Sequence, residues 1–473
     1  MFEWANEALP ASLSARERPR SCQAGPPSPV GGTRARTIGL LAAVLALQSA
    51  DLATVGAVGG QLEGALGIDH FQLGLLVAVA SVFAAAATLP FGVLADRLPR
   101  VRLLAGSVGL WAAAMLATGF AGSFAELLLC RVLLGVVVAA AGPLLASLMG
   151  DLFPSAERAR VYGYVLSGEL VGAGFGFLVS GNVAGLLSWR WAFWVLSPPA
   201  IALAWALLRG LPEPTRGGVA SAPDKRLAQR LASRQGVRPR RAAVVRRATA
   251  RLSLRQAVAH VLRVRTNVVL IVVSATGYLF LAGVETFGVI FVRREYGLSQ
   301  SAATTVLALL GLGALVGVQI GGRLADRMLA RGRLDARIVV GAAAFGAAAG
   351  IVFLPFLSAW PLATAMPLFV IGTAALSCGN PPLDAARLDV MPAALWGRAE
   401  AIRTVLRSLA VTAAPLLFGW LAGAIGGGHG EGLRLSFLIM LAPLCAAGLI
   451  LLYARRTYPA DVAAAALSEE GAE

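Results

Sequence analysis

Five charged side chains fall inside long apolar runs of this sequence, where a charge is costly unless it is paired or hydrated. They are Asp51, Arg131, Glu169, Glu285 and Asp384. A buried carboxyl group can exchange a proton or bind a cation, and an arginine can bind an anion or pair with a carboxylate. These residue types therefore predict proton exchange or ion binding within an apolar surrounding.

Asp51 and Arg131 are expected to lie at a similar depth. At a rise of 1.5 Å per residue, Asp51 is roughly 12 Å and Arg131 roughly 10 Å from the same end of their apolar runs. A carboxylate that meets an arginine in one state and loses it in another changes its proton affinity, as a proton-coupled carrier requires. We expect Asp51 to be the coupling site; the alternative is a permanent structural ion pair.

The other three acidic residues allow more than one role. Glu169 sits among glycines and Glu285 near several aromatic residues, and either is expected to bind a cationic substrate group or to carry a proton. The aromatic neighbours of Glu285 are also consistent with simple packing. Asp384 precedes Arg387 by three residues, which predicts a local pair on one helix face.

Residue types that would indicate catalysis, a metal or a cofactor are sparse. The four cysteines form no CxxC or CxxH pair, the three histidines lie far apart, and the only lysine, Lys225, follows no glycine-rich loop. These features argue against a zinc site and against a Walker A nucleotide loop. We expect no catalytic residue, no metal, no cofactor and no enzymatic activity.

The elements that must position these charges are long apolar helices. Of the 473 residues, 57% are hydrophobic and only 14% are charged, whereas soluble domains are about one quarter charged. The apolar runs of about 20 residues are long enough to cross a ~30 Å hydrocarbon layer. We therefore predict an all-α, polytopic membrane protein; a large soluble helical protein is the disfavoured alternative. Twelve spans are expected, at 37–59, 71–93, 102–121, 124–146, 161–185, 191–210, 267–292, 302–325, 338–357, 361–382, 402–424 and 435–454.

Charge also divides the chain. Alternate loops are rich in arginine, and the positive-inside rule places these loops and both termini on the cytoplasmic side of a cell membrane. The expected parts are a disordered N-terminus (1–36), two six-helix bundles (37–210 and 267–455), a basic linker (211–266) and a cytoplasmic tail (456–473).

The end of the linker has the pattern of an amphipathic helix. Leu254, Val258, Val261 and Leu262 follow Ser253, a plausible N-cap, at helical spacing. We expect this helix to lie on the inner leaflet, where its arginines meet anionic lipid headgroups. Nucleic acid is not an expected partner, because no aromatic residues are interleaved for base stacking.

The two bundles repeat one another in sequence. Gly92-Val-Leu-Ala-Asp96-Arg97 returns as Gly322-Arg-Leu-Ala-Asp326-Arg327, each after the second span of its half. A second landmark follows each fourth span, with Pro143, Asp151 and Pro154 returning as Pro381, Asp389 and Pro392 at equal spacing. The repeats predict two halves of the same topology, related by an axis along the membrane normal.

At these residues the chain resembles the major facilitator superfamily. The Gly-x-Leu-Ala-Asp-Arg loop followed by Arg100, together with Arg131-x-x-x-Gly135, carries the resemblance. A finer similarity is to the spinster-like branch, through Asp51, the glycine-rich fifth span and two further short segments, residues 188–194 and 212–217. Members of that branch are associated with lysolipid and sphingolipid movement.

The repeated loops are expected to close one side of the molecule. Gly92 and Gly322 allow close helix contact, and a carboxylate is stabilised at a helix N-terminus. Asp96 should therefore face the start of the eleventh span, around 399–403, and Asp326 the start of the fifth. The predicted gating set is Gly92, Asp96, Arg97, Arg100, Asp151, Gly322, Asp326, Arg327 and Asp389. The alternative is that these charges only mark topology.

Together these features predict a secondary active transporter that works by alternating access, with a small-molecule substrate and protons as partners. Because few polar groups are expected to face the central cavity, the leading hypothesis is proton-coupled export of a lipophilic or amphipathic solute. The alternatives are a proton-coupled symporter that imports a small metabolite, a membrane enzyme acting on lipid, and a non-transporting membrane sensor.

Overall fold

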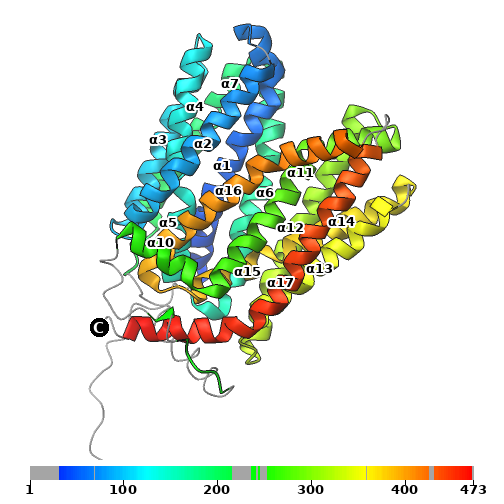
Figure 1. The fold of residues 1–473 in the computed structure, drawn as a ribbon. Coiled ribbons are helices and arrows are strands. Elements are labelled where there is room, and N and C mark those ends of the chain that lie inside the picture. The colour runs from blue at the N-terminus through cyan, green and yellow to red at the C-terminus, as the bar shows by residue number, and fades with distance from the viewer. Residues whose placement is uncertain are drawn as a thin grey trace, which may run out of the picture.

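The computed structural model describes residues 31–68, 70–215, 236–240, 243–244, 253–357, 360–425 and 431–470. Within them lie twelve helical segments long and apolar enough to cross a membrane, which confirms the predicted all-α, twelve-span architecture. Figure 1 shows the spans in two groups, blue to green and green to red, that converge at one end and diverge toward the other.

The first group holds α1 to α8. Their bounds are Gly31–Leu66 (α1), His70–Ala95 (α2), Arg100–Phe120 (α3), Phe124–Val138 (α4), Ala141–Leu152 (α5), Ser155–Leu186 (α6), Trp189–Trp194 (α7) and Ser197–Gly210 (α8). α4 and α5 form one span, and so do α7 and α8. Helix α1 begins at Gly31, inside the segment expected to be disordered, and its Arg34 pairs with Glu157 of α6. Residues 1–30 lie outside the described part of the chain.

The second group holds α11 to α17. Their bounds are Arg265–Tyr296 (α11), Gln300–Ala330 (α12), Ala336–Leu357 (α13), Leu362–Cys378 (α14), Asn380–Asp389 (α15), Ala393–Leu395 (the 3₁₀ turn η3), Trp396–Ile425 (α16) and Glu431–Glu470 (α17). The fourth span of each half is broken at corresponding places, before Pro143 and before Pro381-Pro382. Proline has no N–H to donate and its ring crowds the carbonyl four residues earlier, so each break follows from the sequence.

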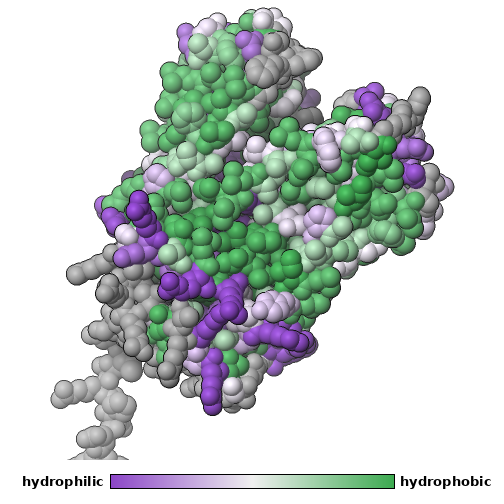
Figure 2. Space-filling view, viewed as in Figure 1, coloured by the Kyte–Doolittle hydropathy of each residue, from purple (hydrophilic) through white to green (hydrophobic). Residues whose placement is uncertain are grey.

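The two ends of the molecule differ in charge and in packing. We call the end with the loops at 95–100 and 330–336 the basic end, and the opposite end the open end. The two halves pack together at the basic end through α2 and α5 against α16, and through α6 against α12 and α15. Figure 2 shows hydrophilic residues concentrated toward this end, an apolar surface over both lobes, and a notch between the lobes at the open end.

The linker helix is present where the sequence places it. Helix α10 spans Leu254–Arg263, and Ser253 caps it by accepting a hydrogen bond from the Gln256 backbone while the Gln256 side chain accepts from the Ser253 backbone. Ala257 and Val261 are buried against α11 and α16, whereas Leu254 and Leu262 are exposed. Much of the remaining linker lies outside the described residues.

The last helix is longer than a single span. α17 continues through Arg455 to Glu470, and its end lies across the basic end (red in Figure 1). Asp461 accepts a hydrogen bond from the Thr266 backbone at 3.0 Å, and Tyr458 and Ala464 are fully buried. The segment expected to be a tail from residue 456 is therefore a packed helix up to Glu470, because small alanines and two polar anchors fit it against the bundle.

Helices α1 and α6 pack with their backbones in direct contact. Gly168, Gly172 and Gly176 of α6 face Ala42, Ala46 and Ala50 of α1, and a Cβ atom added at any of the three glycines would overlap the facing backbone. Small residues four apart allow such close approach between membrane helices. This contact holds Asp51 on α1 beside the helix that carries Glu169.

We predict that Gly172→Leu prevents correct assembly of this helix pair, because overpacking a close contact costs at least about 1–3 kcal/mol. Gly174→Leu is the matched control, since a Cβ at Gly174 meets open space. The measurement is size-exclusion profile and thermal unfolding in detergent. Equal stability of the two variants would contradict the packing described here.

Candidate functional site

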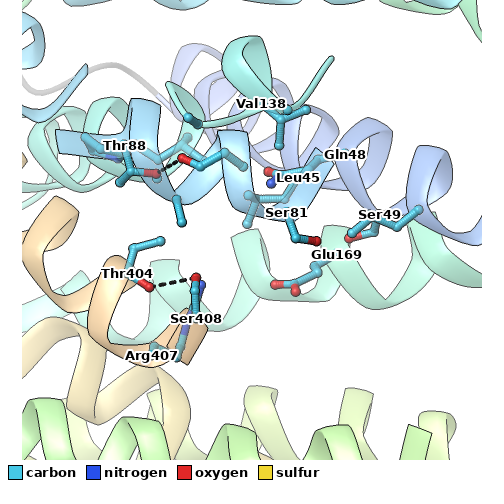
Figure 3. A pocket seen from close by; sticks show the side chains of 18 of the residues that line it. Leu45, Gln48, Ser49, Ser81, Thr88, Val138, Glu169, Thr404, Arg407 and Ser408 are labelled. Carbon is cyan, nitrogen blue, oxygen red and sulfur yellow. Dashed lines mark hydrogen bonds between the residues drawn. The ribbon is translucent and has the colours of Figure 1, made fainter. Parts of the chain in front are cut away.

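A cavity of about 340 Å³ lies between the two halves. Helices α1, α2, α4, α5 and α6 line it from one half, and α11, α15 and α16 from the other. Figure 3 shows Gln48, Ser49, Ser81 and Glu169 on one side of this space and Thr404, Arg407 and Ser408 on the other. Its volume is within the range of ~300–1,000 Å³ typical of small-molecule sites.

Eight charged side chains line the cavity: Asp51, Arg131, Glu169, Asp384, Arg387, Glu400, Arg403 and Arg407. The expectation that few polar groups face it is therefore wrong. The eleventh span was expected to begin at residue 402, but α16 begins at Trp396 and extends as one helix past Arg407. Glu400 thus belongs to the helix that lines the cavity, not to the loop before it.

Asp51 and Arg131 form the expected ion pair. Arg131 Nη1 donates to Asp51 Oδ1 at 3.1 Å, both side chains are buried, and the guanidinium lies 5.1 Å from the centroid of the Phe193 ring. Arg131 Nη2 is buried and has no hydrogen-bond partner among the described residues. The pair thus joins α1 to α4 while one donor of the arginine stays unused.

Of the remaining predicted site residues, some line the cavity and one does not. Glu169 of α6 lines the same cavity as Asp51. Glu285 of α11 is exposed and is not among the cavity-lining residues. Asp384 pairs with Arg387 as expected, and Arg387 also donates to Glu400 at 2.7 Å.

Sequence reasoning missed three charged residues of the cavity lining, all on α16: Glu400, Arg403 and Arg407. Arg403 pairs with Glu400 and donates to Ser274 at 2.9 Å. Arg407 lies over the Tyr278 ring, 4.2 Å from its centroid. The available signal was Arg407 itself, an arginine five residues inside the span expected at 402–424.

At the basic end, Asp96 of α2 meets the first turn of α16. Its carboxylate accepts from the backbone N–H groups of Gly397 and Arg398 at 3.1 and 3.3 Å and from Arg398 Nε at 2.6 Å. Gly92 allows this approach, because a Cβ there would lie 2.6 Å from Ala401 Cβ. Asp96 therefore contacts the helix that the sequence indicated, at its first turn.

Asp326 makes the corresponding contact on the other side of the pseudo-symmetry axis. Its carboxylate accepts from the Arg160 backbone N–H of α6 at 2.7 Å. A Cβ at Gly322 would lie 2.5 Å from the Ala159 carbonyl oxygen, so this contact also needs a glycine. Two carboxylates, one from each half, thus accept backbone hydrogen bonds from a helix of the opposite half, Asp96 at the first turn of α16 and Asp326 at the second turn of α6.

Asp151 and Asp389 join further groups at the same end. Arg100, another member of the predicted gating set, pairs with Asp151 and also with Glu213 at 3.2 Å. Asp389 pairs with Arg337 of its own half and with Arg158 of the other half at 3.1 Å, and it accepts from the Tyr458 hydroxyl at 2.6 Å.

Arg337 and Tyr458 were not predicted to take part. Arg337 pairs with Asp389 as Arg100 pairs with Asp151, but it follows Gly322 by fifteen residues whereas Arg100 follows Gly92 by eight. Tyr458 belongs to the segment expected to be a tail. The two remaining members of the predicted gating set, Arg97 and Arg327, are exposed at the surface.

Metal binding has no support among the described residues, where no group of three His, Cys, Asp or Glu side chains could hold an ion. The polar groups of the cavity lining are guanidinium, carboxylate, hydroxyl and amide groups.

Comparison with known proteins adds sequence relatives and a structural neighbour. A 177-residue segment is 32% identical to the 3-(3-hydroxy-phenyl)propionate transporter of Escherichia coli, covering 37% of this chain and 44% of the relative. A 191-residue segment is 28% identical to Protein spinster of Drosophila melanogaster, covering 40% and 31%. The chain thus matches less than half the length of these curated relatives.

The fold is that of a bacterial homolog to the human lysosomal transporter Spinster, solved in an inward-facing and occupied conformation. The TM-score is 0.54 at 20% identity, covering 91% of this chain and 99% of that structure. The sequence pattern of the Major Facilitator Superfamily matches residues 40–395, most of both six-helix halves. This chain belongs to the Major Facilitator Superfamily, and its similarity to spinster proteins confirms the resemblance read from its motifs.

Proposed function

We propose that this protein is a proton-coupled secondary transporter that moves a small amphipathic solute by alternating access. The observation that carries the proposal is the charged cavity between two halves that are bonded to each other at the basic end. A solute bound there reaches the other side when the bonds at the basic end break and the open end closes.

The gate in this proposal is the set of contacts at the basic end. Asp96 bonds the N-terminus of α16, Asp326 bonds the Arg160 backbone in the second turn of α6, and Asp389 bonds Arg158 across the same boundary. Such contacts have two arrangements, made or broken, as a switching interface requires. Glycines at 92 and 322 let the halves separate without unpacking large side chains.

Proton coupling is assigned to Asp51. The pair with Arg131 lines the cavity, so a solute or a proton that enters can change it. Arg131 has one unused donor there, which favours exchange of partners over a fixed pair. Glu169 is the alternative coupling carboxylate; Glu285 is less suited, because it does not line the cavity.

The charged lining favours symport over the export of a lipophilic solute. A solute that carries its own charge into this cavity enters together with a proton, and the inward proton gradient then drives uptake. The similarity to a transporter named for 3-(3-hydroxy-phenyl)propionate, an organic acid, supports the same choice. Export and a non-transporting sensor are outcomes of the transport test below.

The proposed orientation puts the basic end on the cytoplasmic side of the cell membrane, following the positive-inside rule. Helix α10 then lies at the inner leaflet, where exposed Leu254 and Leu262 enter the headgroup region and its arginines meet anionic lipid.

Orientation is tested by labelling single cysteines in a background without native cysteine. We expect Arg331→Cys, at the end of α12, to react only with reagent applied from the cytoplasm. Leu186→Cys, at the open end, should react only from outside. Reaction of Arg331→Cys from outside would contradict the proposed topology.

The gate is tested with Asp96→Asn, which keeps the shape and removes the charge. Hydrogen bonds to a charged group contribute about 1.5–3 kcal/mol, so the closed basic end should lose roughly 10-fold or more in relative population. Turnover per folded protein should fall, and a cysteine at Thr404 in the cavity should become more reactive from the cytoplasm. Arg97→Gln, an exposed neighbour, is the control. Wild-type turnover and labelling in Asp96→Asn would mean that the charge only marks topology.

Coupling is tested with Asp51→Asn in proteoliposomes, using a panel of organic acids with and without an imposed pH gradient. If Asp51 carries the proton, solute exchange survives and pH-driven accumulation vanishes. If the pair is only structural, Asp51→Asn leaves Arg131 unpaired and unstable, and adding Arg131→Gln restores folding and accumulation together. Accumulation per folded protein that persists in the single variant, or returns in the double, overturns the role of Asp51.

A further inference from the structure

The charges of the cavity are not all paired. Asp51 pairs with Arg131, Asp384 with Arg387, and Glu400 with both Arg387 and Arg403. Two charged side chains of the lining have no ion pair with any described residue: Glu169 on α6 and Arg407 on α16. They belong to opposite halves of the protein, and Figure 3 shows them on opposite sides of the space.

Arg407 is held ready to bind a ligand. Its guanidinium lies over the Tyr278 ring at 4.2 Å, which fixes one planar face and leaves the N–H edge free to donate. Thr404 and Ser408, on the same helix, also line the cavity. A planar guanidinium positioned in this way suits the two oxygens of a carboxylate.

Closure of the cavity has different consequences for Glu169 and Arg407, the two side chains without an ion pair. An unpaired charge costs several kcal/mol once water is excluded at membrane depth. A carboxyl group such as that of Glu169 can avoid this cost by taking up a proton, whereas an arginine side chain stays charged in proteins. Arg407 therefore requires an anionic partner when the cavity closes, while Glu169 does not require a cationic one.

The rest of the lining indicates the body of the ligand. Leu52 and Val77 of the first half line the cavity and are 58% and 44% exposed in this state. Apolar side chains that face an open cavity gain free energy when an apolar ligand covers them. The site thus joins an anion-binding group on α16 to an apolar wall on α1 and α2.

We propose that Arg407 binds the carboxylate of an organic acid whose apolar body lies against Leu52 and Val77, and that Glu169 is the internal carboxylate that takes its place at Arg407 when the empty cavity closes. This inference rests on the proposed transport function and names its substrate class. It makes Arg407 the residue that determines specificity for anions.

The test is equilibrium binding to purified protein by titration calorimetry. The probes are 3-(3-hydroxyphenyl)propionate, its primary amide and the corresponding propylamine, which share one apolar body and differ in charge. Wild-type protein should bind the carboxylate about 10-fold or more tightly than the amide, the scale of charge-assisted hydrogen bonds. The amine should bind no more tightly than the amide.

Variants of Arg407 and Glu169 test which side chain causes the preference for the carboxylate. Arg407→Gln should reduce the preference for the carboxylate to within about 2-fold while leaving amide affinity unchanged. Arg407→Lys should retain part of the preference, because the ammonium keeps the charge but cannot donate two parallel hydrogen bonds as the planar guanidinium does. Glu169→Gln should strengthen carboxylate binding, since it removes the competing acid. Arg97→Gln, outside the cavity, is the control, and size-exclusion profiles confirm folding.

The inference is overturned if wild-type protein prefers the amide or the amine, binds none of the three probes at millimolar concentration, or keeps its carboxylate preference in Arg407→Gln. Binding needs no gradient, so these outcomes are separate from failure of the proposed transport. Gradient-driven transport without carboxylate preference rejects only the role of Arg407. Carboxylate preference without gradient-driven transport rejects only the coupling.

Discussion

A charge that is carried into an apolar helix must find a partner or water, and the arrangement of this protein follows from that requirement. Arg131 on α4 is held by Asp51 on α1, and Arg387 on α15 by Asp384 and by Glu400 of α16. The Asp51–Arg131 pair joins helices that are distant in sequence, and the Arg387–Glu400 pair joins α15 to α16. Glu169 and Arg407, which have no ion pair with any described residue, face the cavity between the halves, where a ligand and a proton can reach them.

The same requirement holds at the basic end, where backbone N–H groups of helices join arginines as partners of the carboxylates. Asp96 accepts from N–H groups that the first turn of α16 leaves without intrahelical acceptors, and Asp326 accepts from the Arg160 N–H in the second turn of α6. Because the two contacts are related by the internal repeat, they can be made or lost together. A glycine at each contact, Gly92 and Gly322, lets the facing helices approach closely.

Hydropathy and the internal repeat made part of the structure predictable from the sequence. The apolar runs predicted the spans, and the repeated loop predicted the two halves and the contact of Asp96 with the eleventh span. The similar depth of Asp51 and Arg131 in their spans predicted that they pair. The roles of Arg337 and Tyr458 did not, because the second loop is longer than the first and because α17 continues as a packed helix beyond its apolar run. The cluster on α16 was missed since an arginine near a span boundary is usually taken to face solvent, and only the packing of α16 against α2 and α5 turns Glu400, Arg403 and Arg407 toward the cavity.

The central claim is that two rigid halves exchange an interface at one end for an interface at the other. Distances between paired spin labels test it directly, with one pair at Phe120 and Leu357 of the open end and another at Arg97 and Arg331 of the basic end. Both pairs join the two halves at exposed positions. Alternating access predicts two distance populations at each end, long at the open end when short at the basic end, with proportions that shift together with pH and bound solute. A single distance at both ends under all these conditions would contradict the account.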